Sequence, residues 1–83
     1  MELVGKKRFK GKKGEVYNQL FCIRPVNDYD LRYSLEVSGS ALETLWVSDE
    51  VFNKVTDKDF HKNITLVTDY INGRSTIVDI KIG

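Results

Sequence analysis

An Asn-Gly pair between two β-forming runs constrains the fold of this chain more than any other feature. Residues 64–71 and 75–82 are rich in Ile, Val and Thr, which favour strands. A two-residue type I′ turn requires positive φ at both central positions, and Asn72 followed by Gly73 meets that requirement. The sequence therefore predicts a β-hairpin centred on this pair.

Residues 15–23 predict a further strand with two apolar faces. Leu20 and Cys22 fall on one side of such a strand, while Tyr17 and Phe21 fall on the other. A strand that is apolar on both faces is typical of the centre of a sheet. The lone cysteine cannot form an internal disulfide, and its place in this pattern predicts a buried core thiol.

Alternation is also clear in residues 31–37, which predict a strand with polar residues facing out. Residues 38–40 interrupt the pattern, either as a turn or as a bulge in one long strand that continues through residues 41–47. The predicted core-facing residues of the first segment are Leu31, Tyr33, Leu35 and Val37.

The remaining segments are shorter. Residues 3–10 predict a frayed first strand, residues 11–14 a flexible basic turn, and residues 24–30 a loop. Ser48 is suited to the N-cap of a short helix, because two acidic residues follow it where the helix dipole favours them. Its apolar stripe would comprise Val51, Phe52 and Val55.

These elements predict one mainly β domain spanning residues 1–83, with a basic segment at residues 1–14. Five or six strands and one short helix near residues 49–55 favour a small closed or half-closed barrel of the OB-like or SH3-like kind, because closure removes exposed strand edges. A three-stranded sheet with a helix on one face is the alternative.

Charge is distributed unevenly along the chain. Residues 1–14 contain six basic residues and one acidic residue, a net charge of +5. The other 69 residues contain seven basic and eleven acidic residues, a net charge of −4. Such a basic block, with an aromatic residue inside it, is suited to a polyanionic partner.

Aromatic residues lie within and beside the basic block. Cationic groups that follow a phosphate backbone, interleaved with rings that stack on bases, are what single-strand binding requires. Phe9 and Tyr17 are the first candidates for stacking, and Tyr29 is the next because it lies in a polar segment. The full set of candidate nucleic-acid-binding residues is Lys6, Lys7, Arg8, Phe9, Lys10, Lys12, Lys13, Tyr17, Phe21, Arg24, Tyr29 and Arg32.

No catalytic or metal-binding pattern is present. A single histidine, His61, and a single cysteine do not make a zinc site of the usual spacing. Asp57 and Asp59 alternate with His61, a pattern more typical of a solvated loop than of a metal site. Residues 11–14 lack the spacing of a phosphate-binding loop. We therefore expect no enzymatic activity and no cofactor.

No signal peptide is recognisable, and the longest apolar run is far below the ~20 residues that span a bilayer. Together with the unpaired cysteine, this predicts a cytoplasmic protein without a membrane partner.

The run from Lys12 to Cys22 resembles the early strands of the small single-stranded DNA-binding proteins of filamentous phages. Those proteins are similar in length and have a basic glycine-containing hairpin, then a tyrosine, then an apolar strand with a lone cysteine. The closing strand–turn–strand around Asn72-Gly73 is also similar. The resemblance implies a five-stranded OB-like barrel, a homodimer, cooperative coating of single strands, and a phage or mobile-element origin.

The sequence thus predicts binding of single-stranded nucleic acid, with DNA as the first candidate and with little sequence preference. The alternative function is a protein–protein interaction module, such as a phage assembly, adaptor or inhibitor protein, that uses a sheet edge or the acidic face. In that case the basic segment would aid solubility or protect an edge strand.

Overall fold

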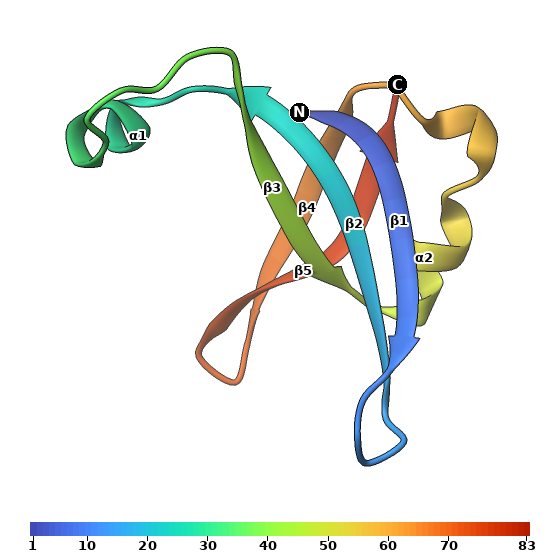
Figure 1. The fold of residues 1–83 in the computed structure, drawn as a ribbon. Helices are drawn as coiled ribbons and strands as arrows, with labels where there is room; N and C mark the ends of the chain where they lie inside the picture. Colours follow the sequence, from blue (N-terminus) through green and yellow to red (C-terminus); the bar gives the residue numbers. More distant parts are fainter.

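The computed structural model describes residues 1–83, of which 54% lie in strands and 18% in helices. The first sheet has the order β1-β2-β3, the second is the hairpin β4-β5, and all pairings are antiparallel (Figure 1). The predicted mainly β class is therefore confirmed. The strands are β1 (Glu2–Lys10), β2 (Val16–Pro25), β3 (Ser40–Val47), β4 (Ile64–Ile71) and β5 (Arg74–Ile82). The helices are α1 (Asp28–Tyr33), α2 (Asp49–Lys54) and the 3-10 turn η1 (Asp57–Asp59).

The C-terminal hairpin is confirmed where the sequence places it. Asn72 has a φ of 52° and Gly73 a φ of 78°, as a type I′ turn requires. Strands β4 and β5 pair on either side of this turn, from Ile71 opposite Arg74 to Ile64 opposite Ile82.

Helix α2 is also confirmed. The Ser48 side chain caps its first turn, because the backbone N–H of Val51 donates a hydrogen bond to the Ser48 hydroxyl oxygen over 3.3 Å. Val51, Phe52 and Val55 are buried, as the predicted stripe requires. A helix of six residues is too short to be stable alone, so its apolar side must be held by the sheets.

The predicted strand at residues 31–37 is wrong. Residues 28–33 form α1 instead, and the chain has no regular structure from there to β3. The reason is local: the Asn27 side chain accepts from the Asp30 backbone N–H, and the Asp30 carboxylate accepts from the Asn27 backbone N–H, each over 3.0 Å. This capping box starts a helix where apolar alternation favours a strand.

The side chains assigned to the core face of that strand are consequently not in the core. Leu31, Tyr33 and Leu35 are exposed, and Val37 is half-buried. The predicted loop at residues 24–30 is correspondingly short, because β2 continues to its first two residues and α1 takes its last three.

The core lies between the two sheets and α2. Leu3 and Leu20 contribute from the first sheet, Ile64 and Ile80 from the second, and Val51 from α2. Cys22 is 1% exposed, which confirms the predicted core thiol. Burial raises the pKa of that thiol and so disfavours the reactive thiolate.

The two sheets meet at both sides of this core. Near the N-terminus, Leu3 donates its backbone N–H to the Lys62 carbonyl over 2.9 Å, and Glu2 forms a bridge with Asn63 beside β4. Strands β3 and β5 are also in contact. A closed barrel is not detected, so the predicted barrel is not confirmed. The structure establishes two antiparallel sheets that together contain five strands.

A β-bulge divides β1 into two halves. Leu3 pairs with Cys22 and Gly5 pairs with Phe21, so Val4 is an extra residue between two consecutive pairs. Because an extra residue changes which face each later side chain takes, Leu3 points into the core with the even-numbered residues that follow the bulge.

We predict that Gly73→Val destabilises the protein by about 1 kcal/mol or more, because a β-branched residue is poorly tolerated at positive φ. Denaturant unfolding followed by circular dichroism measures the effect. Gly73→Asn is the matched control, since Asn tolerates the left-handed region, and it should retain most of the stability. Equal losses in both variants would contradict the turn assignment.

Candidate nucleic-acid interface

Three aromatic rings gather on the outer face of the first sheet, one from each strand. The ring centroids of Phe9 and Tyr17 are 5.5 Å apart, those of Phe9 and Trp46 6.2 Å, and those of Tyr17 and Trp46 5.9 Å. Tyr17 and Trp46 are 39% and 58% exposed, while Phe9 is half-buried between them. We call Phe9, Tyr17 and Trp46 the aromatic cluster.

Strand register brings this cluster together. Phe9 lies directly opposite Tyr17, and Gln19, two residues along β2, lies opposite Trp46. Cross-strand and diagonal neighbours on one face are within reach of aromatic side chains. The turn contributes as well, because a Cβ at Gly11 would stand 2.8 Å from the Tyr17 ring. Only glycine allows the backbone to approach that ring so closely.

The basic residues of β1 divide between its two faces. Lys6 points inward and its Nζ donates to the carbonyl oxygens of Val55 over 2.7 Å and Phe52 over 3.5 Å, at the C-terminal end of α2. Its Nζ also lies 4.4 Å from the centroid of the Phe52 ring. A cation at a helix C-terminus satisfies carbonyls that have no partner within the helix. Lys6 therefore holds α2 against the sheet.

Arg8 makes the second inward contact. Its Nε donates to Asn18 Oδ1 over 2.7 Å and its Nη2 donates to Asn53 Oδ1 over 3.1 Å. Asn18 is 5% exposed and donates in turn to Asp49 Oδ1 over 2.7 Å. Arg8 and Asn18 thus connect β1 and β2 to both ends of α2. We call Lys6, Arg8 and Asn18 the α2 clamp.

The other lysines of the basic segment are exposed and form no ion pair or side-chain hydrogen bond. Lys7 lies on the outer face, with its Nζ 5.1 Å from the centroid of the Phe9 ring. Lys10 is at the end of β1, and Lys12 and Lys13 occupy the turn that follows. Lys7 therefore lies on the face of the aromatic cluster, and Lys12 and Lys13 lie in the turn beyond it, whereas Lys10 falls on the side of β1 that carries Lys6 and Arg8.

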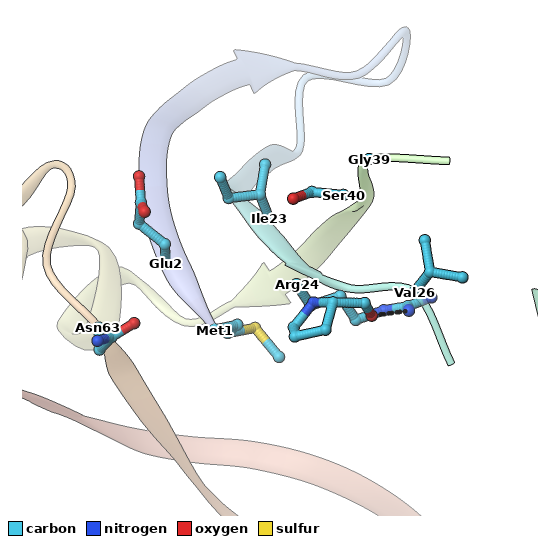
Figure 2. Close-up of a pocket in the computed structure, with 9 residues that line it drawn as sticks. Met1, Glu2, Ile23, Arg24, Val26, Gly39, Ser40 and Asn63 are labelled. Carbon is cyan, nitrogen blue, oxygen red and sulfur yellow. Dashed lines mark hydrogen bonds between the residues drawn. The ribbon is translucent and has the colours of Figure 1, made fainter. Parts of the chain in front are cut away.

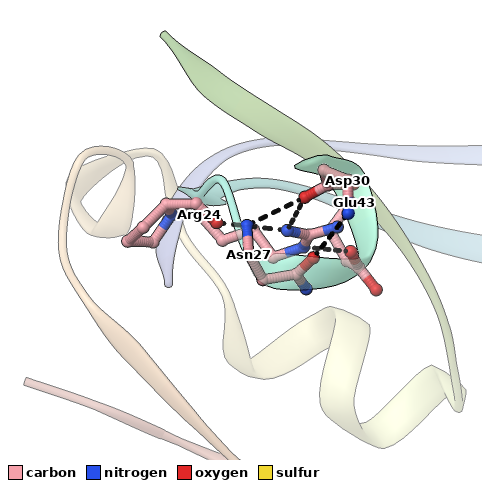
Figure 3. A network of polar contacts seen from close by, with 5 residues as sticks. Arg24, Asn27, Asp30 and Glu43 are labelled. Atoms are coloured by element: carbon pink, nitrogen blue, oxygen red, sulfur yellow. Dashed lines mark hydrogen bonds and ion pairs between the residues drawn. The ribbon is translucent and has the colours of Figure 1, made fainter. Parts of the chain in front are cut away.

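Three further predicted residues lie elsewhere. Arg24 is at the opposite end of β2, where its Nη1 donates to Asp30 over 2.9 Å and its Nε to Glu43 over 2.8 Å (Figure 3). The hydrogen bond from Arg24 holds the pKa of Asp30 below its usual value, and this pairing raises the pKa of Arg24. Tyr29 and Arg32 are exposed on α1 at that same end of the sheet.

Phe21 is on the same face as the aromatic cluster but four residues farther along β2 than Tyr17, and its ring is paired with none of the three. It lies on the outer face of β2, half-buried, and its ring covers Gly5, where an added Cβ would stand 3.2 Å from the ring. The structure therefore brings together Lys7, Phe9 and Tyr17, next to the turn that carries Lys12 and Lys13, and leaves Phe21 beside Gly5.

Sequence reasoning missed Trp46. The signal was present, because alternation in β3 puts it on the face opposite to the buried Leu45. Beside it is an open hollow of about 370 Å³ that residues at the end of β3 and the start of β5 line, Arg74 among them. Trp46 therefore extends the aromatic cluster toward the second hairpin.

No family model, curated protein or solved structure matches this chain. The structure brings no three His, Cys, Asp or Glu side chains together as a metal site. Neither α1 nor α2 has the length and hydrophobicity that a helix needs to cross a membrane.

We predict that Lys6→Gln lowers the free energy of unfolding by about 1 kcal/mol, because it removes a charged donor from carbonyls at the end of α2. Lys12→Gln, the matched control in the exposed turn, should leave stability unchanged within ~0.5 kcal/mol. Denaturant titration compares the two variants. If both behave alike, the α2 clamp does not stabilise the fold.

Proposed function

We propose that this protein binds single-stranded nucleic acid, with DNA as the first candidate, on the outer face of the first sheet. The observation that carries the proposal is the exposed aromatic cluster flanked by unpaired lysines. Rings offer stacking surfaces to bases of any identity, and lysines neutralise phosphates without reading sequence. Little sequence preference follows from both.

A single strand suits this face better than a duplex. The rings of the aromatic cluster are tilted relative to each other, by 34° for Phe9 and Tyr17 and by 76° for Tyr17 and Trp46. A base can stack on one of these rings only if it is unpaired and free to turn. Base pairs in a duplex present their edges and not their faces.

The bound nucleic-acid strand would run between the tips of the two β-hairpins. Lys12 and Lys13 lie at the first tip, and Arg74 follows the turn at the second. Both tips extend toward the same end of the molecule (Figure 1). OB-folds bind oligonucleotides on the face of their second and third strands, between the loops that join strands 1–2 and 4–5. An OB-like closure of the two sheets is part of this proposal.

The remaining expectations belong to the same proposal. We place the protein in the cytoplasm, because the free thiol of Cys22 fits a reducing compartment. The resemblance to phage single-stranded DNA-binding proteins also implies a homodimer, which would present two such interfaces in one particle.

We predict that log affinity for a labelled oligonucleotide of about 20 bases falls linearly with log salt concentration. Changing Lys12 and Lys13 together to Gln should reduce the slope by roughly 1–1.5, at ~0.7 for each lost single-strand contact. Fluorescence anisotropy over a salt series measures it. The matched control changes Lys58 and Lys81 together to Gln. Both lysines are exposed and outside the interface, so this change should leave the slope unchanged.

We predict that Trp46→Ala and Tyr17→Ala each weaken binding about 5- to 150-fold at every salt concentration, which corresponds to 1–3 kcal/mol for a stacked base. The slope should stay nearly constant, because stacking releases no counterions. Tyr33→Ala on α1 is the matched control and should bind as the wild type does. Duplex of the same length should bind more weakly than single strand.

The absence of binding to DNA or RNA at low salt would overturn the proposal. The basic segment would then serve solubility or edge protection, and the interaction-module alternative would take its place.

A further inference from the structure

The connection between β2 and β3 projects from the body of the molecule as a flap, residues 26–39, that carries α1 (Figure 1). No residue of α1 is buried. Four large apolar side chains of the flap are each more than half exposed. They are Tyr29, Leu31, Tyr33 and Leu35. Exposed apolar side chains that are concentrated in one segment of a small protein mark that segment for interaction.

The flap is anchored at its root. Arg24 of β2 pairs with Asp30 of α1 and with Glu43 of β3, and its side chain is 24% exposed (Figure 3). The rings of Tyr29 and Tyr33 contact each other with centroids 4.7 Å apart. The apolar surface is thus presented in a defined geometry. A helix of six residues nevertheless has little stability in water without packing, so a cover over α1 would stabilise it.

A hollow of about 560 Å³ lies at the root of the flap (Figure 2). Val26 and Gly39, the two ends of the flap, both line it, and Met1 and Ile23 add apolar surface. A projection and a hollow that adjoin on one surface are self-complementary across a two-fold axis, because each copy can fill the hollow of the other. This arrangement favours a second copy over an unrelated partner.

The charges of α1 also favour a second copy of the chain as the partner. Asp28 lies in its first turn and Arg32 in its last turn, one helical turn apart, and neither forms an ion pair within the chain. Two antiparallel copies of α1 would place Arg32 of each copy near Asp28 of the other. Antiparallel helix dipoles also attract.

We propose that the flap is a self-association surface, on which α1 packs antiparallel against α1 of a second copy and each flap covers the hollow at the root of the other. The surface goes beyond the proposed nucleic-acid interface and does not depend on it. The flap joins the end of the sheet opposite to the tip that carries Lys12 and Lys13 (Figure 1).

Sedimentation velocity tests the proposal, from about 1 to 200 μM protein. We expect twice the 9.6 kDa mass of the chain at the upper concentrations. Leu31→Ser combined with Leu35→Ser should weaken association at least tenfold, whereas the control Tyr70→Ser, at a residue 78% exposed on β4, should not. A monomer at every concentration, or growth beyond a dimer, would overturn the proposal. Circular dichroism and denaturant unfolding show whether the flap variants keep their fold.

A charge exchange tests the antiparallel packing. Asp28→Arg alone and Arg32→Asp alone should each weaken the dimer, because like charges then face each other across the axis. An equal mixture of the two variants should recover association as a heterodimer, since both facing pairs become opposite in charge. Recovery is a result that loss of helix stability cannot produce. If the mixture associates no better than either variant, the antiparallel arrangement is wrong.

Discussion

The contact between the basic face of β1 and the end of α2 is the interaction on which the rest of the structure depends. Lys6 binds the last carbonyls of α2, and Arg8 reaches its first turn through Asn18 and Asp49. On its other side α2 connects to β5, where Lys54 donates to Asp79 and to the Ile80 carbonyl. Helix α2 therefore links the two sheets around a small core.

One strand thus supports both the fold and the proposed interface. Residues of β1 after its bulge alternate between the α2 clamp and the outer face, so neighbouring cations have different surroundings. Net charge alone does not reveal this division. Of the six cations in the basic segment, two are bound within the molecule, and four are left for a partner. The electrostatic part of the proposed binding would then depend on those four.

Much of the fold follows from the sequence where one local rule decides. Asn72-Gly73 defines a hairpin and Ser48 caps a helix, and both predictions are confirmed. The prediction of a strand at residues 31–37 is wrong because two local rules compete there. Apolar alternation favours a strand, but the capping box of Asn27 and Asp30, fixed by Arg24 from a neighbouring strand, starts a helix first. That ion pair joins residues six positions apart, a separation that matches neither the period of a strand nor that of a helix.

The candidate site could be predicted only in part for the same reason. Phe9 and Tyr17 follow from their places in strands, and the structure puts them in contact. Trp46 joins them through the register of β2 and β3, which no local pattern specifies. Lys6 and Arg8 were expected among the phosphate-binding residues, but their inward direction depends on the bulge in β1.

That bulge decides where the N-terminal strand can lose a residue. Leu3 and Phe9 are both odd-numbered, yet Leu3 is in the core and Phe9 is on the surface, because Val4 is the extra residue between them. Deleting Val4 would make the Leu3–Cys22 and Gly5–Phe21 pairs consecutive, so β1 would lose its bulge while Leu3 stayed inward and Phe9 stayed outward. A deletion between Gly5 and Phe9 would instead reverse the faces of the residues on one side of it. Related chains should therefore tolerate the loss of one residue at the bulge much more readily than a loss elsewhere in β1.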